Sequence, residues 1–260
     1  MKRIVIKVGS SVLTELNTIA KERMLNLLSL IAQARQKYEV ILVSSGAVAA
    51  GYTALKLDRD KHISKKVLAA VGQPILMSGY KNKFDIYSID TSQILLTEED
   101  LDSRTHTKIF QQIIEKTLEN GILPIVNEND ISTTPEQLFG DNDQLSAHVA
   151  HYTNSDTLII LSDIEGLYDS NPKNNPKAKI RKIVNKITEE ELSQKFTPNS
   201  RFASGGIVTK LKAAEYIMSQ NMEMFLCSGY DLTTAREFLM EDKHNKGTLF
   251  SQKTKVENKT

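Results

Sequence analysis

Two lysines each stand near glycine at a predicted end of a strand or a helix, where they could bind an anion. Lys7 lies in the apolar run 3–8 and is followed by Gly9 and Ser10. Burying an ammonium group without a partner is costly, so this one must reach a partner or an open crevice. In α/β sheets such a crevice lies outside the carboxyl ends of the strands, where ligands bind. Taken alone, the motif is more simply explained by an ordinary strand-end lysine before a glycine turn.

The second lysine follows a pair of glycines that leads into a helical pattern. The segment consists of Ser204, Gly205, Gly206, Ile207, Val208, Thr209 and Lys210. Paired glycines before a helix allow successive backbone amides to surround phosphate oxygens. Lys210 falls in the first turn, which is the unfavourable end of a helix for a cation unless an anion also lies there. We therefore predict a phosphate-binding loop.

A third segment, residues 43–51, reads as a strand end, a turn of small residues and the start of a helix. Free amides at a helix N-terminus attract a carboxylate or a phosphate, and Ser45 beside Gly46 could add a hydroxyl donor. The alternative is a serine that caps a tightly packed alanine helix. The sequence leaves both interpretations open.

Polar side chains follow the apolar run 122–126. Asn127 and Asp130 belong to a run of four polar residues, and Asp141, Asn142 and Asp143 come before a second helical pattern. Carboxylates and amide oxygens suit the recognition of an α-amino group. A simple helix cap is one alternative, and a Mg²⁺ or Ca²⁺ site is another, although the spacing is not that of an EF-hand and we assign no metal ligand.

The last candidate segment follows the run 157–161 and contains Ser162, Asp163 and Tyr168. By itself it reads as a strand, a turn and a hairpin; in a nucleotide-binding protein it would form a wall for adenine and ribose. The sequence has neither G-x-x-x-x-G-K-[ST] nor G-x-G-x-x-G, and the nearest candidate, residues 46–51, lacks the lysine. The usual phosphate loops therefore do not account for these motifs.

These segments need a sheet to bring them together. The runs 3–8, 40–43, 122–126, 157–161 and 222–226 are short and mostly apolar, which is typical of parallel strands covered on both faces. Amphipathic patterns at residues 23–36, 107–119 and 209–219 lie between them. The alternation predicts an α/β sandwich with a mostly parallel sheet. We expect one domain over residues 1–260, with a substrate half at about 1–152, an ATP half at 153–252 and a tail at 253–260.

Composition excludes several classes of protein. The 260 residues carry a formal net charge of +1, which gives no field suited to nucleic acid or a membrane surface. The single cysteine, Cys227, allows neither an internal disulfide nor a cysteine metal cluster, and we expect it to be a buried residue. No apolar run approaches the roughly 20 residues of a membrane span, and no signal peptide is evident. We expect a soluble cytoplasmic protein.

Taken together, the motifs resemble the amino-acid kinase superfamily, most closely its glutamate-phosphorylating members. The similar segments are Lys-Val-Gly-Ser-Ser at 7–11, Ser-Ser-Gly-Ala-Val-Ala-Ala-Gly at 44–51, Ala-Ala-Val-Gly-Gln-Pro at 69–74, Asn-Glu-Asn-Asp at 127–130, Phe-Gly-Asp-Asn-Asp at 139–143, Gly-Leu-Tyr at 166–168 and Ser-Gly-Gly-Ile-Val-Thr-Lys at 204–210. Any one motif is weak, but the ordered set is specific. The resemblance implies a three-layer α/β/α fold and transfer of the γ-phosphoryl group of ATP, with Mg²⁺, to the γ-carboxylate of L-glutamate.

The resemblance also implies roles for individual residues. Glutamate would be held by Ser45, Asp130 and Asn142, with Gly46, Asn127 and Asp141 nearby. ATP would be held by Ser162, Asp163 and the loop 204–210, with Gly9, Ser10 and Tyr168 nearby. Lys7 and Lys210 would flank the transferred phosphoryl group. We expect Asp143 to pair with one or both lysines, and Asp141 is the alternative.

The chain departs from its relatives in two places. Many of the glutamate-phosphorylating members carry a C-terminal domain of the PUA type, which we do not find after the segment 247–250. The ATP loop is commonly Gly-Thr-Gly-Gly-Met, whereas residues 203–207 read Ala-Ser-Gly-Gly-Ile. By analogy we expect a homodimer or homotetramer, possible feedback inhibition by proline, and a downstream dehydrogenase that consumes the labile acyl phosphate of proline biosynthesis.

Other functions compete with this interpretation. A sibling kinase would act on N-acetylglutamate, aspartate, carbamate or a nucleoside monophosphate, but the acidic run 127–130 favours an acceptor with a free amine. A catalytically silent amino-acid sensor could use the same fold. The presence of both Lys7 and Lys210 argues against a sensor, which has little need for two phosphate-binding cations. Nucleic-acid binding is disfavoured by the charge.

Overall fold

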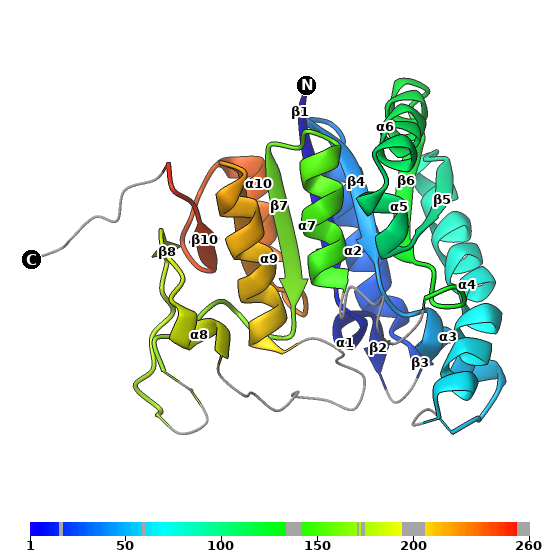
Figure 1. Ribbon diagram of the computed structural model, residues 1–260, viewed down its shortest axis with the longest axis horizontal. Coiled ribbons are helices and arrows are strands. Elements are labelled where there is room, and N and C mark those ends of the chain that lie inside the picture. Colours follow the sequence, from blue (N-terminus) through cyan, green and yellow to red (C-terminus); the bar gives the residue numbers. More distant parts are fainter. Residues whose placement is uncertain are drawn as a thin grey trace, which may run out of the picture.

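The computed structural model describes residues 1–15, 18–58, 61–133, 142–170, 172, 175–193 and 206–253. Their centre is an eight-stranded sheet in the order β5-β6-β4-β1-β7-β9-β10-β8 (Figure 1). The strands are β1 (Lys2–Val8), β4 (Tyr38–Ser44), β5 (Thr91–Leu96), β6 (Leu123–Glu128), β7 (Thr157–Ser162), β8 (Ile183–Val184), β9 (Glu223–Ser228) and β10 (Thr248–Phe250). All neighbours are parallel except β9 and β10. The predicted mostly parallel sheet is confirmed.

The five predicted strands all form, and four of them, β4, β6, β7 and β9, end one or two residues later than their apolar runs. The extension matters most in β6, because Asn127 and Glu128 are the last two residues of that strand rather than part of a following loop. Their side chains are therefore held by strand geometry at the carboxyl edge of the sheet. Cys227 lies buried in β9, as expected, and burial raises the pKa of its thiol to about 12.

Helices cover both faces of the sheet and complete the three layers. On one side lie α2 (Lys21–Ala34), α4 (His62–Phe84) and α10 (Thr233–Glu241); on the other lie α5 (Glu98–Asp102), α6 (Arg104–Glu119), α7 (Asn142–Tyr152) and α9 (Ile207–Ser219), seen in front of the sheet in Figure 1. The remaining elements are α1 (Ser10–Leu13), α3 (Ala47–Ala54), α8 (Glu189–Ser193), a 3₁₀ turn (Asp85–Tyr87), and a small hairpin of β2 (Thr14–Glu15) and β3 (Thr18–Ile19).

The alternation of side chains along β1 decides where Lys7 points. Ile4, Ile6 and Val8 pack in the core shared with α2 and α10, whereas Val5 packs in the core shared with α7 and α9. Successive side chains of a strand point to opposite faces. Lys7 therefore points to the same side as Val5, toward α7 and α9.

Close packing explains the small residues of the segments 44–51 and 69–74. A Cβ atom on Gly51 would lie 1.9 Å from the carbonyl oxygen of Leu68, and one on Gly72 would lie 1.7 Å from that of Ala47. Helices α3 and α4 can pack at this distance only because both positions are glycine. We did not predict α4 as one 23-residue helix, because Pro74 lies inside it.

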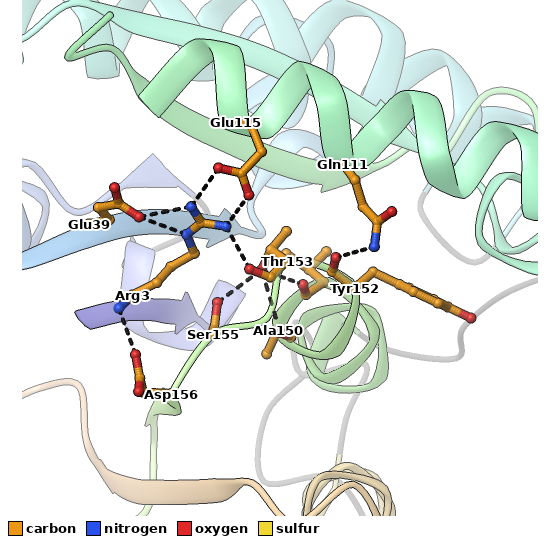
Figure 2. A network of polar contacts seen from close by, with 10 residues as sticks. Arg3, Glu39, Gln111, Glu115, Ala150, Tyr152, Thr153, Ser155 and Asp156 are labelled. Atoms are coloured by element: carbon orange, nitrogen blue, oxygen red, sulfur yellow. Dashed lines mark hydrogen bonds and ion pairs between the residues drawn. The ribbon is translucent and has the colours of Figure 1, made fainter. Parts of the chain in front are cut away.

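A network of polar contacts joins several elements at the end of the sheet where β1 and β4 begin, which we call the amino edge (Figure 2). Arg3 donates from Nε to Glu39 Oε2 at 2.9 Å, and from Nη1 to Glu115 Oε1 and to the carbonyl oxygen of Thr153, both at 2.6 Å. The Arg3 amide donates to Asp156 Oδ2 at 2.8 Å. One guanidinium thus joins β1, β4 and α6 to the end of α7.

No described helix is both long enough and apolar enough to span a membrane.

Candidate active site

Two lysines from distant parts of the chain meet at one carboxylate. Lys7 Nζ lies 2.5 Å from Asp143 Oδ1, and Lys210 Nζ lies 3.0 Å from Asp143 Oδ2. Thr209 Oγ1 donates to the same Oδ2 at 3.1 Å. The structure therefore joins Lys7 and Lys210, which are 203 residues apart in the sequence, at the first turn of α7.

All three charged groups are buried. Lys7 is 3% exposed, Lys210 is 5% exposed and Asp143 is fully enclosed. Charged groups inside a protein are paired or bind ions, because removing them from water costs several kcal/mol each. Two cations directed at one carboxylate create a strongly positive place at the carboxyl edge of β1. Such a place attracts an anion.

The residues expected to bind the acceptor lie beside this pair. Asn142, next to Asp143 in α7, donates from Nδ2 to Ser45 Oγ at 2.9 Å, to Asn127 Oδ1 at 2.8 Å and to the Ser44 carbonyl oxygen at 3.2 Å. The ends of β4, β6 and the start of α7 thus form one polar cluster. The structure brings together three of the predicted acceptor residues: Ser45, Asn127 and Asn142.

The turn after β4 does not contain a serine cap. The N-cap of α3 is Gly46, which has φ of 111° and makes no side-chain hydrogen bond. This left-handed conformation favours glycine. Ser44 instead shares a 2.7 Å hydrogen bond with the Tyr80 hydroxyl, and Ser45 accepts from Asn142. Of the two interpretations left open by the sequence, the serine N-cap is therefore wrong.

Asp130 lies just beyond β6 and is half-buried. Burial raises the pKa of its carboxyl group, and the charges of Lys65 and Lys66 oppose that rise. Lys66 also donates to the carbonyl oxygens of Ile131 and Thr133 at 2.6 and 2.7 Å, which holds the segment after Asp130 against α4. Asp130 is therefore anchored within an environment that contains two cations.

The predicted nucleotide residues lie at the ends of β1 and β7. Ser162 ends β7 and donates from Oγ to Asp163 Oδ1 at 3.1 Å. The Gly9 amide donates to the Leu161 carbonyl oxygen at 3.2 Å, so it joins β1 to β7. Ser10 begins α1.

Tyr168 forms an isolated bridge with Ile180, and its hydroxyl donates to Glu165. These contacts belong to the hairpin that the sequence suggested for this segment.

In the second phosphate motif, Gly206 is the N-cap of α9, and Ile207, Val208, Thr209 and Lys210 form its first turn. Asp141, Ser204 and Gly205 lie outside the described residues. Of the two aspartates considered as partners of the lysines, the structure thus places Asp143 between them.

One residue of the site was missed by the sequence analysis. Gln73 of α4 accepts from Asn127 Nδ2 at 3.0 Å, directly behind the acceptor cluster. It belongs to the segment 69–74, which carried the resemblance but received no role. A glutamine before a proline inside an apolar pattern gives no signal of its own. Only the packing of α4 against the end of β6 shows what it contacts.

The described residues contain no group of three His, Cys, Asp or Glu side chains placed to hold a metal ion. Mg²⁺ is commonly bound through one or two carboxylates together with substrate phosphates, so a dedicated protein cage is not required. The chemistry of the donor set therefore fits a magnesium ion that enters with a nucleotide.

A mostly parallel α/β/α sandwich with two lysines converging at its carboxyl edge is suited to binding phosphate groups. Comparison with known proteins narrows the class: residues 2–228 match the model of the amino acid kinase family, and the chain belongs to that family.

Two curated relatives and one solved structure are similar along nearly the whole chain. A glutamate 5-kinase of Wolinella succinogenes is 51% identical over 257 residues, which cover 97% of this chain and 98% of that one. A glutamate 5-kinase of Leishmania donovani is 46% identical, over 96% of this chain and 95% of that one. The UMP kinase of Bacillus anthracis superposes with a TM-score of 0.65 over 98% of both chains; at 17% identity this likeness concerns the fold alone.

Proposed function

We propose that this chain transfers the γ-phosphoryl group of ATP to the γ-carboxylate of L-glutamate, giving γ-glutamyl phosphate and ADP, the first step of proline biosynthesis. The observation that carries the proposal is the convergence of Lys7 and Lys210 on buried Asp143. Two relatives named glutamate 5-kinase, at 51% and 46% identity, support glutamate as the acceptor.

The reaction needs no general base, because a glutamate side chain with a pKa of about 4.3 is already ionised near neutral pH. A γ-carboxylate oxygen attacks the γ-phosphorus, the bond to the β–γ bridging oxygen breaks, and ADP leaves with its electron pair. Catalysis then consists of bringing two anions together and neutralising charge in the transition state. Lys7 and Lys210 supply that charge, and Asp143 holds their ammonium groups in place.

The acceptor is held on the β4, β6 and α7 side of the lysines. Ser45 and the start of α3 at Gly46 offer a hydroxyl and a helix N-terminus to a carboxylate. Asp130 and Asn142 offer oxygens to the α-ammonium group. Asn127 supports Asn142 through their hydrogen bond. Asp141 belongs to this group in our proposal as it did from the sequence.

ATP is held on the β7 and α9 side. Ser162, Asp163, Gly9, Ser10 and Tyr168 belong to the nucleotide half in this proposal, together with the loop 204–210 before and within the first turn of α9. A Mg²⁺ ion that enters with the nucleotide would neutralise phosphate charge that the lysines do not. The proposal divides the single domain near residue 152, with the acceptor half first and the ATP half second.

The proposal includes the cellular setting. We place the reaction in the cytoplasm, in a homodimer or homotetramer, with proline as an inhibitor and a dehydrogenase as the consumer of the acyl phosphate. A non-catalytic sensor is the alternative of another class. The burial of two lysines around one carboxylate favours the kinase, because a sensor of amino acids gains nothing from a second buried cation.

The proposal is tested with purified protein, Mg²⁺-ATP and L-glutamate, with hydroxylamine trapping the acyl phosphate. N-acetylglutamate, aspartate and uridine monophosphate serve as parallel acceptors, with ADP release as the common measurement. We expect hydroxamate that depends on glutamate, and little turnover with the other acceptors. Turnover only with another acceptor would contradict our assignment of the segment 127–143. Binding of glutamate or ATP without turnover would favour the sensor.

A further inference from the structure

Four side-chain amides form a continuous chain from the edge strand to the acceptor cluster. Gln73 of α4 donates from Nε2 to Gln93 Oε1 of β5 at 3.1 Å, and accepts at Oε1 from Asn127 Nδ2 at 3.0 Å. Asn127 in turn accepts at Oδ1 from Asn142 Nδ2 at 2.8 Å. This series of amides thus ends at Asn142, which our proposed function places against the substrate.

Backbone groups fix the direction of this chain. The Glu128 amide can only donate, and it lies 2.9 Å from Asn127 Oδ1, so that atom must be the oxygen. The Asn127 nitrogen therefore faces Gln73, and the Gln73 atom that accepts from it must be the amide oxygen. At the other end, the Ser44 carbonyl can only accept, so the atom of Asn142 that faces it must be the nitrogen.

The direction has a consequence for the ligand. Asn142 commits its nitrogen to Ser44, Ser45 and Asn127. A ligand therefore meets this side chain through its oxygen, which is an acceptor. An acceptor suits an α-ammonium group and does not suit a carboxylate.

We propose that Gln73 is a positioning residue for amine recognition: it satisfies and holds the buried Asn127 amide, and through it the position from which Asn142 presents oxygen to the α-ammonium group of the acceptor. This inference rests on the proposed function. In this role Gln73 acts through Asn127 and does not touch the substrate.

The hydrogen bond between Gln73 and Asn127 matters more than the one between Gln73 and Gln93, because Asn127 is buried. Asn127 and Asn142 are 3% and 7% exposed, whereas the link between Gln73 and Gln93 lies at an exposed position. Without Gln73, the buried nitrogen of Asn127 is left without its acceptor, so the side chain shifts toward water and its hold on Asn142 weakens. Without Gln93, water can replace the lost partner of Gln73. The backbone at Gln73 is held in place, because the preceding Gly72 packs directly against α3.

The experiment compares Gln73→Leu, Gln73→Glu and Gln93→Leu. We expect Gln73→Leu to raise the glutamate KM about tenfold or more, the effect of losing roughly one well-placed hydrogen bond to a charged group, with the ATP KM little changed. Gln73→Glu keeps an oxygen for Asn127 and should restore most of the affinity. Gln93→Leu is the matched control, because it removes only the outer, exposed member of the four amides. It should change the glutamate KM less than about threefold.

Glutarate separates this role from a merely structural one, because it is glutamate without the amine. We expect its constant as a competitive inhibitor to be the same in the parent protein and in Gln73→Leu. An unchanged glutamate KM in Gln73→Leu, or an equal loss of glutarate and glutamate affinity, overturns the inference. If Gln73→Leu does not fold, Gln73→Asn, whose amide is too short to reach Asn127, is measured in its place with the same expectations. Parent protein that does not turn over glutamate overturns the proposed function itself, which keeps the two failures distinct.

Discussion

A basic side chain near each end of β1 forms an ion pair, and the two pairs lie in opposite surroundings. At the carboxyl edge, Lys7 near the end of β1 pairs with Asp143 at the start of α7, and both are buried. At the amino edge, Arg3 near the start of β1 pairs with Glu115 of α6 and also binds the Thr153 carbonyl just after α7 (Figure 2). There the side chains of Glu39 and Glu115 are 37% and 50% exposed.

The two contacts of β1, through Arg3 and Lys7, are separated by similar distances along β1 and along α7. From Arg3 to Lys7 a strand advances about 13 Å. From Asp143 to Thr153 a helix and its end advance about 15 Å. The same strand and helix are therefore joined at both ends. The difference teaches that burial, rather than the presence of an ion pair, separates a site for chemistry from a structural fastening: a buried pair is weak evidence for stability, and an exposed pair contributes modestly.

The largest expected effect is on turnover at the carboxyl edge. Lys7→Ala and Lys210→Ala should each lower kcat by about 10²-fold or more, if each lysine supplies a few kcal/mol of transition-state stabilisation. The measurement is steady-state kinetics at saturating ATP and glutamate. Lys243→Ala, which removes an exposed lysine paired with Glu241, is the control and should retain full activity. Turnover near that of the parent in both variants would falsify the mechanism.

Asp143→Asn sharpens the comparison, because it keeps the shape of the side chain and removes the shared charge. Two buried lysines then face each other across a neutral amide, which we expect to lower the free energy of unfolding by about 3–5 kcal/mol and to lower kcat as strongly as the lysine changes. Urea denaturation and kinetics measure the two effects. Parent-like stability would mean that Asp143 does not hold the lysine charges.

Asp130 lies between the two extremes of burial. Asp130→Ala should raise the glutamate KM about tenfold or more and leave kcat nearly unchanged, because a charge-assisted hydrogen bond to the α-ammonium group is lost in ground and transition state alike. Since burial raises the pKa of this carboxyl group, the parent protein should also lose glutamate affinity as pH falls through that raised value. An unchanged glutamate KM in Asp130→Ala would remove the residue from the acceptor site.

The amino edge should give a smaller effect, on stability alone. Arg3→Ala removes contacts to Glu39, Glu115 and the Thr153 carbonyl, and we expect a loss of about 1–2 kcal/mol in the free energy of unfolding. At temperatures well below the unfolding transition, kcat should be that of the parent. A large loss of kcat in the folded variant would show that the two edges are coupled through α7.

The smallest expected effect is the pH dependence of the Glu115 pair. The hydrogen bond from Arg3 is the main reason that the pKa of Glu115 lies below its ordinary value of 4.5. A carboxyl group with a lowered pKa in the folded state adds stability above its unfolded pKa and loses it as pH falls through the folded value. The difference in stability between the parent and Glu115→Gln should therefore be present at neutral pH, below about 1 kcal/mol, and vanish in acid. A difference that stays constant down to strongly acid pH contradicts this origin.

The sequence predicted the elements that depend on local pattern. Apolar runs gave the five central strands, because a strand buried on both faces must be apolar throughout. It did not give β5, β8 or β10, nor α4 as a continuous helix. The strand β5 lies at the edge of the sheet and includes the polar residues Thr91, Ser92 and Gln93, and Pro74 interrupts the helical signal of α4.

The candidate site was likewise predictable as a set of residue types and not as a set of contacts. Lys7 and Lys210 were found because a lysine is unusual at these strand and helix ends, and Ser45 and Asn142 were found because they lie in motifs that resemble the family's. The commitment of the Gly9 amide to Leu161, and the place of Gln73 behind Asn127, could not be found in this way. Both follow from which elements lie side by side, and no local signal encodes that.

By itself the sequence determined which chemical groups are present, which family motifs they form and where the five central strands lie. Only the tertiary structure decided that Asp143 takes both lysines, that Ser45 accepts from Asn142 instead of capping α3, and that Asn142 turns its amide nitrogen toward Ser45 and Asn127. The physical reason is that these choices depend on hydrogen-bond direction and burial between residues up to about 200 positions apart, which are set when α7 and α9 pack on the face of the sheet to which Lys7 points.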